Sequence, residues 1–207
     1  MKMPPRGLPL VLASGSPRRR ELLSRLGLEL IVDAPNVDES PLAGEPPAIH
    51  AARIAGAKVA AVAPRHPELP VLGADTVVAV GERILGKPPD RDAARAMLTE
   101  LSGRTHVVVT ALALRLGSVL ARHLDQARVT FVPFDRELIR WYLATGEGDD
   151  KAGAYAVQGQ GAVLVAAVEG NVQTVVGLPL APLPALFARV GLSLHGDGDR
   201  LRLDRRE

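Results

Sequence analysis

Three consecutive arginines, at positions 18–20, follow a turn of small residues near the N-terminus. The stretch LASGSPRRREL (12–22) places Ser14, Gly15 and Ser16 between an apolar run and the start of a predicted helix. Serine hydroxyls, exposed backbone N–H groups and a helix N-terminus all favour an anion. The guanidinium forks of arginine match the oxygens of a phosphate. The stretch therefore indicates a phosphate-binding turn, and the alternative is an ordinary capped helix with solvated arginines.

Asp75 lies inside an apolar run, VLGADTVV, where a charged side chain is costly unless it is paired, hydrogen-bonded or part of a site. We interpret it as a functional residue, and the alternative is a strand-end aspartate that accepts backbone hydrogen bonds. Lys87 follows shortly, in LGKPP, where a glycine and two prolines restrict the chain. Such a lysine is either held to meet a phosphate or solvated at the surface.

Further acids and a lysine suggest a metal and a charged pocket. Asp38 and Glu39, in VDES, together with Asp75 offer carboxylates of the kind that Mg²⁺ and Mn²⁺ prefer. The alternative is a pair of solvated loop acids. Lys58, in the alanine-rich stretch RIAGAKVAAV, is by default an exposed helix lysine.

A glycine-rich loop, 146–162, gathers polar residues late in the chain. Gln158 lies in it, and its amide offers both a donor and an acceptor, which suits the edge of a nucleobase. The alternative is an ordinary polar surface residue of the loop. Asp150, Lys151 and Tyr155 belong to the same loop.

Several kinds of site are excluded by composition and spacing. There is no cysteine, which removes disulfides, thiolate zinc sites and cysteine nucleophiles. The five histidines show no zinc-ligand spacing, and His106 is expected to be structural. Neither a P-loop nor a G-x-S-x-G elbow is present. Aromatic residues make up only 3%, which argues against a platform that stacks nucleic-acid bases.

These residues must be positioned by alternating strands and helices. We expect strands over 8–13, 28–35, 69–80, 105–116, 120–134, 163–168 and 173–176, and helices over 17–26, 48–63, 91–101, 135–145 and 182–190. This order indicates an α/β or α+β fold with a mixed sheet. Residues 1–191 are expected to form a single domain, and residues 192–207 a polar, frayed tail.

The net charge of +2 indicates neither a nucleic acid nor a membrane as a partner. The N-terminal apolar stretch is too short for a secretory signal, and no run is long enough to span a bilayer. We therefore expect a cytoplasmic protein.

Seven stretches of the sequence resemble the Maf family of nucleoside triphosphate pyrophosphatases, and they occur in the family's order from Leu12 to Pro179. They are LASGSPRRRELL, VDES, GADTVV, LGKP, MLTELSGRTHVVVTALAL, DKAGAYAVQG and VVGLP. The resemblance implies a mixed α/β (α+β) fold like that of Maf proteins and inosine triphosphatases. Such a fold has two lobes around one cleft and a mixed, mostly antiparallel central sheet. The resemblance also implies hydrolysis of a nucleoside triphosphate to the monophosphate and pyrophosphate with Mg²⁺ or Mn²⁺.

The roles of individual residues are implied by the same resemblance. Asp75 corresponds to the catalytic aspartate that accepts a proton from the attacking water, and Glu39 to an essential acid. Both are also candidate metal ligands, and whether Asp75 is base or ligand is left open. Lys87 is the third candidate catalytic residue. The expected substrate-binding residues are Ser14, Arg18, Arg19, Lys58, Thr76 and Gln158, and Arg20 is expected at the surface.

GADTVV together with SGRTH resembles the branch of the family that acts on dTTP and UTP. The branch acting on 7-methyl-GTP tends to carry SDQ in the strand motif. In this sequence Thr76 occupies the position of that glutamine. Ala156 departs from the family by replacing a usual glycine. One alternative is a pyrophosphatase for 7-methyl-GTP or for modified and non-standard nucleotides. Another is a nucleotide-binding regulator of septum formation that acts through a partner. A homodimer is expected by analogy.

Overall fold

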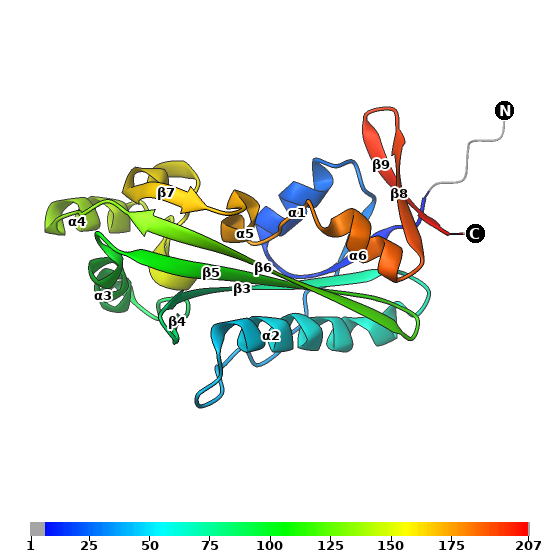
Figure 1. Cartoon of the computed structure of the whole chain (residues 1–207), viewed down its shortest axis with the longest axis horizontal. Helices are drawn as coiled ribbons and strands as arrows, with labels where there is room; N and C mark the ends of the chain where they lie inside the picture. The colour runs from blue at the N-terminus through cyan, green and yellow to red at the C-terminus, as the bar shows by residue number, and fades with distance from the viewer. Residues whose placement is uncertain (1–6, 207) are drawn as a thin grey trace.

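Three long strands, β3 (Val71–Val80), β5 (Thr105–Leu116) and β6 (Val119–Phe131), form the centre of a seven-stranded sheet in this computed structural model, which describes residues 7–206 (Figure 1). Two further strands, β1 (Leu10–Ala13) and β2 (Leu30–Val32), extend the sheet in parallel pairs. The pairs formed by β4 (Arg83–Leu85) and β7 (Val165–Glu169) are antiparallel, as are those within the centre. The mixed α/β fold with a mostly antiparallel sheet is therefore confirmed.

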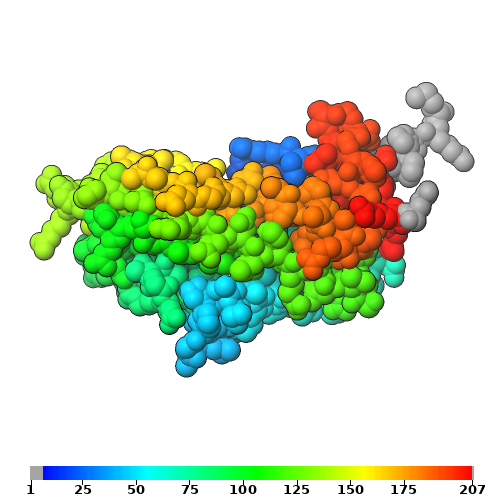
Figure 2. Space-filling view, in the orientation of Figure 1, coloured from blue at the N-terminus to red at the C-terminus, as the bar shows by residue number. Residues whose placement is uncertain are grey.

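Helices cover both faces of this sheet. Figure 1 shows α2 (Pro47–Val62) on one face, and α1 (Pro17–Ser24), α5 (Val172–Val176) and α6 (Leu183–Arg189) on the other. At one end of the long strands lie α3 (Arg91–Leu101) and α4 (Arg136–Ala144). Short 3₁₀ segments span Ala63–Arg65, Ala152–Ala154 and Gly159–Leu164. The molecule is elongated, and the segment around α2 protrudes from one side (Figure 2).

Alternating side chains explain why both faces are covered. Successive residues of a strand point to opposite faces, so the apolar strands need an apolar partner on each side. Val11, Val71 and Val77 pack in a cluster with α2. Leu12 and Leu72 belong to the cluster that includes the buried residues of α6.

The outer edge of β3 is interrupted, and this interruption creates the cleft. β5 pairs with β3 along its other edge from Val71 to Ala79. On the outer edge, β1 pairs only with 71–73 and β4 only with 78–80. Residues 74–77 therefore have no strand beside them on that edge. The gap separates a part of the molecule built on β1, β2 and α2 from a part built on β4, α3 and α4.

The expected strand over 173–176 is wrong, because these residues belong to helix α5. The carboxamide of Asn171 caps this helix by accepting from the Gln173 amide, and Gly177 ends it with a left-handed backbone (φ 112°). A short apolar run does not distinguish a strand from a single buried helical turn.

The expected frayed tail is also wrong, because β8 (Leu192–Asp197) and β9 (Arg200–Arg205) form a hairpin. Leu192 and Leu203 are fully or almost fully buried, so alternate apolar residues tie the hairpin to the core beside α6. Its polar composition reflects only its exposed face. Residues 1–6 and 207, parts of the expected domain and tail, lie outside the described residues. None of the helices within 7–206 is long and apolar enough to cross a membrane.

Gly73 allows α2 to approach β3 closely. A Cβ atom at this position would lie 2.8 Å from the Ala55 carbonyl oxygen and 2.8 Å from Val59 Cγ2. Backbone cannot yield at such a distance, so only glycine fits. The close approach determines how near the next turn of α2 comes to the gap in β3.

We predict that Gly73→Ala lowers the free energy of unfolding by about 1–3 kcal/mol, because the added methyl group overpacks the α2–β3 interface. The matched control is Gly56→Ala within α2, where an added Cβ has nothing within 4 Å. This control should raise stability by about 0.5–1 kcal/mol through helix propensity. Urea unfolding of both variants measures the two effects, and equal stabilities would contradict the close approach.

His106 is buried beneath the cleft and stays neutral. Its Nε2 lies 2.8 Å from the Tyr155 hydroxyl, and its ring meets Phe131 edge to face. Burial lowers the pKa of His106 to about 4. The structural role expected from the sequence is confirmed.

We predict that stability falls as the pH drops from about 6.5 towards 4. In this window the unfolded chain binds a proton at His106 that the folded protein does not, so acid favours unfolding by up to about 1.4 kcal/mol per pH unit. Urea unfolding at several pH values should show a shallower acid dependence for His106→Gln. The exposed His195 is the control for the replacement itself, and His195→Gln should stay within about 0.5 kcal/mol of the wild type at neutral pH. Identical profiles for His106→Gln and the wild type would refute the assignment.

Candidate functional site

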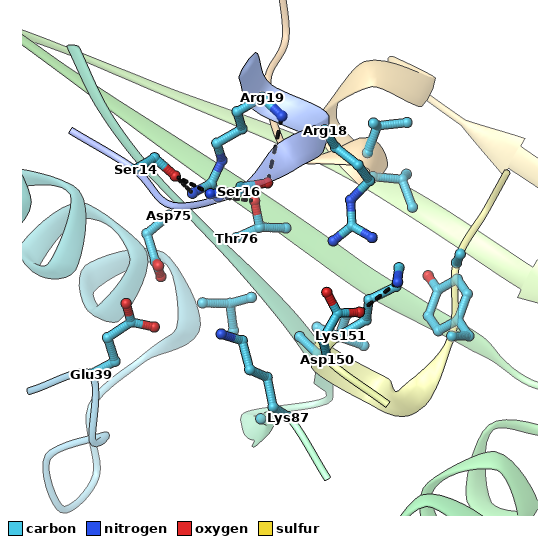
Figure 3. A pocket seen from close by; sticks show the side chains of 18 of the residues that line it. Ser14, Ser16, Arg18, Arg19, Glu39, Asp75, Thr76, Lys87, Asp150 and Lys151 are labelled. Atoms are coloured by element: carbon cyan, nitrogen blue, oxygen red, sulfur yellow. Dashed lines mark hydrogen bonds and ion pairs between the residues drawn. The ribbon is translucent and has the colours of Figure 1, made fainter. Parts of the chain in front are cut away.

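A cleft of about 780 Å³ opens where β3 lacks an outer neighbour. Its size suits a ligand such as a nucleotide. The lining residues come from α1 and the turn before it, from α2 and the loop before it, from β3, from β4 and the turn after it, from the loop after α4, and from α5. Figure 3 shows part of this lining. Of the residues expected to form a site, the cleft brings together Ser14, Arg18, Arg19, Glu39, Lys58, Asp75, Thr76, Lys87 and Gln158.

A buried lysine joins two carboxylates at one side of the cleft. Lys58 Nζ lies 2.8 Å from Asp75 Oδ1 and 2.8 Å from Glu39 Oε1. The Lys58 and Asp75 side chains are only 8% and 9% exposed, whereas that of Glu39 is 46% exposed. Lys58 is therefore not the exposed helix lysine that its sequence context suggested. Asp75 is likewise not a strand-end residue, because it lies mid-strand and its partner is a side chain.

Glu39 is stabilised in its ionised form. Partial burial opposes ionisation of Glu39, but the hydrogen bond from Lys58 outweighs it with the help of the charges of Lys58, Lys87 and Arg19. The net result is a lowered pKa of Glu39. The Glu39 carboxylate is thus negatively charged at neutral pH, as binding to a cationic group or a metal ion requires.

The loop that carries Glu39 is fixed by residues that the sequence analysis did not single out. Arg53 on α2 binds the Glu45 carboxylate through Nε at 2.6 Å and Nη2 at 2.7 Å. The same Nη2 donates to the Ser40 carbonyl at 3.0 Å, and His50 Nδ1 lies 3.0 Å from Glu45 Oε2. The spacing of Arg53 and His50 along one helix face was the only available signal. These contacts tie the Glu39 loop to the helix that carries Lys58.

Arg19 uses most of its N–H groups for contacts within the protein. Its Nε donates to the Gly177 carbonyl at 2.8 Å, and Nη1 donates to the Ala74 carbonyl at 2.8 Å and to Ser14 Oγ at 3.1 Å. Nη2 donates to Thr76 Oγ1 at 3.0 Å. Four of its five N–H groups are thereby used within the protein. Arg19 joins the turn before α1, the gap in β3 and the end of α5.

Both acceptor positions of the Ser14 hydroxyl are filled. Ser14 Oγ accepts from the Ser16 amide at 3.2 Å and from Arg19 Nη1 at 3.1 Å. A hydroxyl has two lone pairs and one proton, so the Ser14 proton is left to donate. Ser14 therefore offers a hydrogen-bond donor to the cleft, as an anionic ligand requires.

Gly177 gives a structural reason for the stretch VVGLP. Its carbonyl accepts from Arg19, and its left-handed conformation favours glycine. A Cβ atom would also lie 3.1 Å from Thr76 Oγ1. Glycine thus leaves the Thr76 hydroxyl uncovered.

Arg18 and Lys87 line the cleft from opposite sides, and their charged ends point into it (Figure 3). Within residues 7–206 neither side chain forms an ion pair. Both cations are therefore available to an anionic ligand. Arg20, in contrast, is exposed and does not line the cleft, as expected.

The loop that carries Gln158 is held from two sides. The Glu147 carboxylate accepts from the amides of Gln160 and Gly161 at 3.0 and 2.7 Å. The Tyr142 hydroxyl accepts from the Ala156 amide at 2.9 Å. Gln158 itself is exposed at the edge of the cleft, where its amide can meet a ligand.

The donor set at the cleft suits a metal that is held partly by its ligand. No group of three or more His, Asp or Glu side chains with metal-binding geometry is found within 7–206. Asp75 and Glu39 each use one oxygen for Lys58, which leaves a second oxygen on each carboxylate. Mg²⁺ is typically bound by one or two carboxylates together with phosphate oxygens and waters. The two acids fit such an ion only in company with a phosphate ligand.

Known proteins resemble this chain in sequence. The model of a family described as Maf-like protein matches residues 9–190. The dTTP/UTP pyrophosphatase of Myxococcus xanthus is 51% identical over 89% of this chain and 94% of its own length. That of Symbiobacterium thermophilum is 44% identical over 91% and 97%. Among solved structures, the Staphylococcus aureus Ham1 protein aligns over 59% of this chain and 71% of its own, with a TM-score of 0.42 and 15% identity.

We predict that Arg19→Lys lowers the free energy of unfolding by about 1–3 kcal/mol. An ammonium cannot satisfy the carbonyls of Ala74 and Gly177 and the two hydroxyls together, so a buried acceptor is left without a partner. The matched control is Arg20→Lys on the exposed neighbour, which should stay within about 0.5 kcal/mol of the wild type. Chemical unfolding compares the two, and an unaffected Arg19→Lys would show that the network is dispensable.

Proposed function

Because the chain belongs to the Maf-like family, we propose that it is a nucleoside triphosphate pyrophosphatase, which hydrolyses dTTP and UTP to the monophosphate and pyrophosphate. The observation that carries this proposal is the Asp75–Lys58–Glu39 cluster, which faces the unpaired cations Arg18 and Lys87 across one cleft. The dTTP/UTP pyrophosphatases that are 44% and 51% identical to this chain over most of its length support the choice of substrates.

The cationic groups account for triphosphate binding. Arg18 and Lys87 offset the charge of the phosphates and stabilise the charge that develops as pyrophosphate leaves. Ser14 donates its hydroxyl proton to a phosphate oxygen, since its lone pairs are filled by protein donors. These groups favour an anion at the cleft before any chemistry occurs.

Asp75 is positioned to act on water. Its Oδ1 accepts from Lys58, which fixes the carboxylate and leaves Oδ2 to orient a water molecule. The water oxygen attacks the α-phosphorus, the bond to the bridging oxygen breaks, and the water proton passes to Asp75 and then to solvent. An aspartate is a weak base at neutral pH, so orientation of the water is a main part of its role.

Glu39 would hold a divalent cation, Mg²⁺ or Mn²⁺, against the phosphates through the oxygen that Lys58 leaves free. Asp75 is the alternative ligand, and in that case its free oxygen would bind the ion in place of the water. Such an ion supplies charge neutralisation and a more acidic water when bound. The cation, the homodimer and the cytoplasmic location expected from the sequence stay predictions.

We predict that the protein releases pyrophosphate and monophosphate from dTTP and UTP and that Asp75→Asn reduces kcat by about 10²–10⁴-fold, since general base catalysis contributes this much. A panel of dTTP, UTP, CTP, ITP and 7-methyl-GTP with Mg²⁺ or Mn²⁺ measures the substrate range. Detection of pyrophosphate rather than inorganic phosphate identifies the bond that breaks.

The matched control is Asp92→Asn, an exposed acid in the first turn of α3, outside the cleft. It should keep full turnover. Near-full turnover of Asp75→Asn with saturating metal would overturn the role of Asp75. Nucleotide binding without turnover by the wild type would overturn the enzyme assignment and favour a nucleotide-binding regulator. If 7-methyl-GTP or ITP were hydrolysed faster than dTTP and UTP, that nucleotide would replace them as the assigned substrate.

A further inference from the structure

The Thr76 hydroxyl belongs to a series of hydrogen bonds that runs from β3 to β5 and on to α5 along one face of the sheet. Thr76 Oγ1 lies 2.9 Å from Thr110 Oγ1, and Thr110 Oγ1 lies 2.7 Å from the Thr174 carbonyl oxygen. Thr110 and Thr174 are completely buried, whereas Thr76 is partly exposed and lines the cleft. These hydrogen bonds therefore connect α5 with the part of β3 that lines the cleft.

The direction of each bond follows from the end of α5. The Leu178 amide, the usual helical partner of the Thr174 carbonyl, binds the Gln173 carbonyl instead. The Thr174 carbonyl is thus left without a helical donor, as is general near helix ends. Among residues 7–206, Thr110 is the one residue that donates to it. Because a carbonyl cannot donate, Thr110 must use its single hydroxyl proton for the bond to the Thr174 carbonyl.

The direction of the Thr110 hydrogen bond determines which hydrogen bonds the Thr76 hydroxyl can donate and accept. Thr110 has no proton left, so the Thr76 hydroxyl must donate to it. Arg19 Nη2 then donates to Thr76 Oγ1 at 3.0 Å and fills one of its lone pairs. The one remaining capacity of Thr76 is a lone pair, and Gly177 has no side chain to cover it. Towards a ligand, Thr76 can only accept.

The position of Thr76 indicates which part of a nucleotide it meets. Asp75 and Thr76 are consecutive strand residues, so their side chains leave opposite faces of the sheet. The carboxylate and lysine cluster lies with Asp75. The cleft near α5 also contains the apolar Val175 and Val176, which suit a base better than a phosphate.

We propose that Thr110 is a positioning residue that makes Thr76 an acceptor-only hydroxyl and so selects bases with an imide N–H over cytosine. The inference rests on the proposed function, because it takes a pyrimidine nucleotide as the ligand. Uracil and thymine carry a proton on N3, whereas N3 of cytosine is an acceptor. Two acceptors facing each other leave both without a partner, and a site built for a hydrogen bond rejects such a ligand.

The test measures binding by calorimetry with α,β-methylene analogues of UTP, CTP and N3-methyl-UTP. The wild type should bind the uridine analogue at least about 10-fold more tightly than the other two. In Thr110→Val, which keeps the shape of the side chain but not its hydroxyl, the Thr76 proton is free to point to the ligand. The preference for uridine over cytidine should then fall towards parity.

Thr110→Ser is the matched control, because it restores the hydroxyl and should restore the preference. If Thr110 had a merely structural role, Thr110→Val would weaken the binding of the uridine and cytidine analogues equally and leave the ratio of their affinities unchanged. An unchanged ratio in Thr110→Val, or a wild type that binds N3-methyl-uridine as well as uridine, would overturn the inference. The second arm needs no variant, so it holds even where Thr110→Val fails to fold.

Pyrophosphate release, measured in parallel with UTP and CTP, separates this inference from the proposed function. A binding preference that depends on Thr110 without any turnover would refute the enzyme assignment and support the polarity of Thr76. Turnover of UTP and CTP without a preference would support the enzyme and overturn the inference.

Discussion

The gap in the outer edge of β3, between β1 and β4, is the constraint on which the site depends. Strand residues without a neighbour expose backbone groups that need partners when they are buried. Arg19 meets this need at the Ala74 carbonyl and connects the same guanidinium to Ser14, Thr76 and Gly177. Because the missing neighbour also opens the strand to solvent, one interruption produces both the cleft and the demand for a buried arginine.

The same gap makes both faces of β3 accessible to one ligand. Asp75 faces α2 and meets Lys58, whereas Thr76 faces the opposite side and meets Thr110. In an uninterrupted sheet these consecutive side chains would be separated by the backbone of a neighbouring strand. The arrangement presents the carboxylates on one side of a single strand and the Thr76 hydroxyl on the other side to the same cleft.

Charge and hydrogen-bond polarity are set by residues behind the ones that face the ligand. Lys58 is brought to Asp75 because Gly73 lets α2 approach β3 closely. Arg19 fills one lone pair of Ser14 and one of Thr76, while Thr110 accepts the Thr76 proton. Gly73 and Thr110 carry no charge that would mark them as part of a site, yet they help to decide what the neighbouring cleft residues can offer a ligand.

The sequence by itself determined the order of elements and nearly all candidate residues, because apolar periodicity, turn residues and a charge in an apolar run leave local patterns. Asp75, Glu39, Lys87 and Gln158 were found in this way, and all line the cleft. Only the tertiary structure decided that Lys58 is buried between two acids and that Arg19 binds the turn before α1, the gap in β3 and the end of α5. It also decided that 173–176 is a helix and 192–205 a hairpin. These outcomes depend on contacts between segments far apart in the chain, which no local pattern encodes.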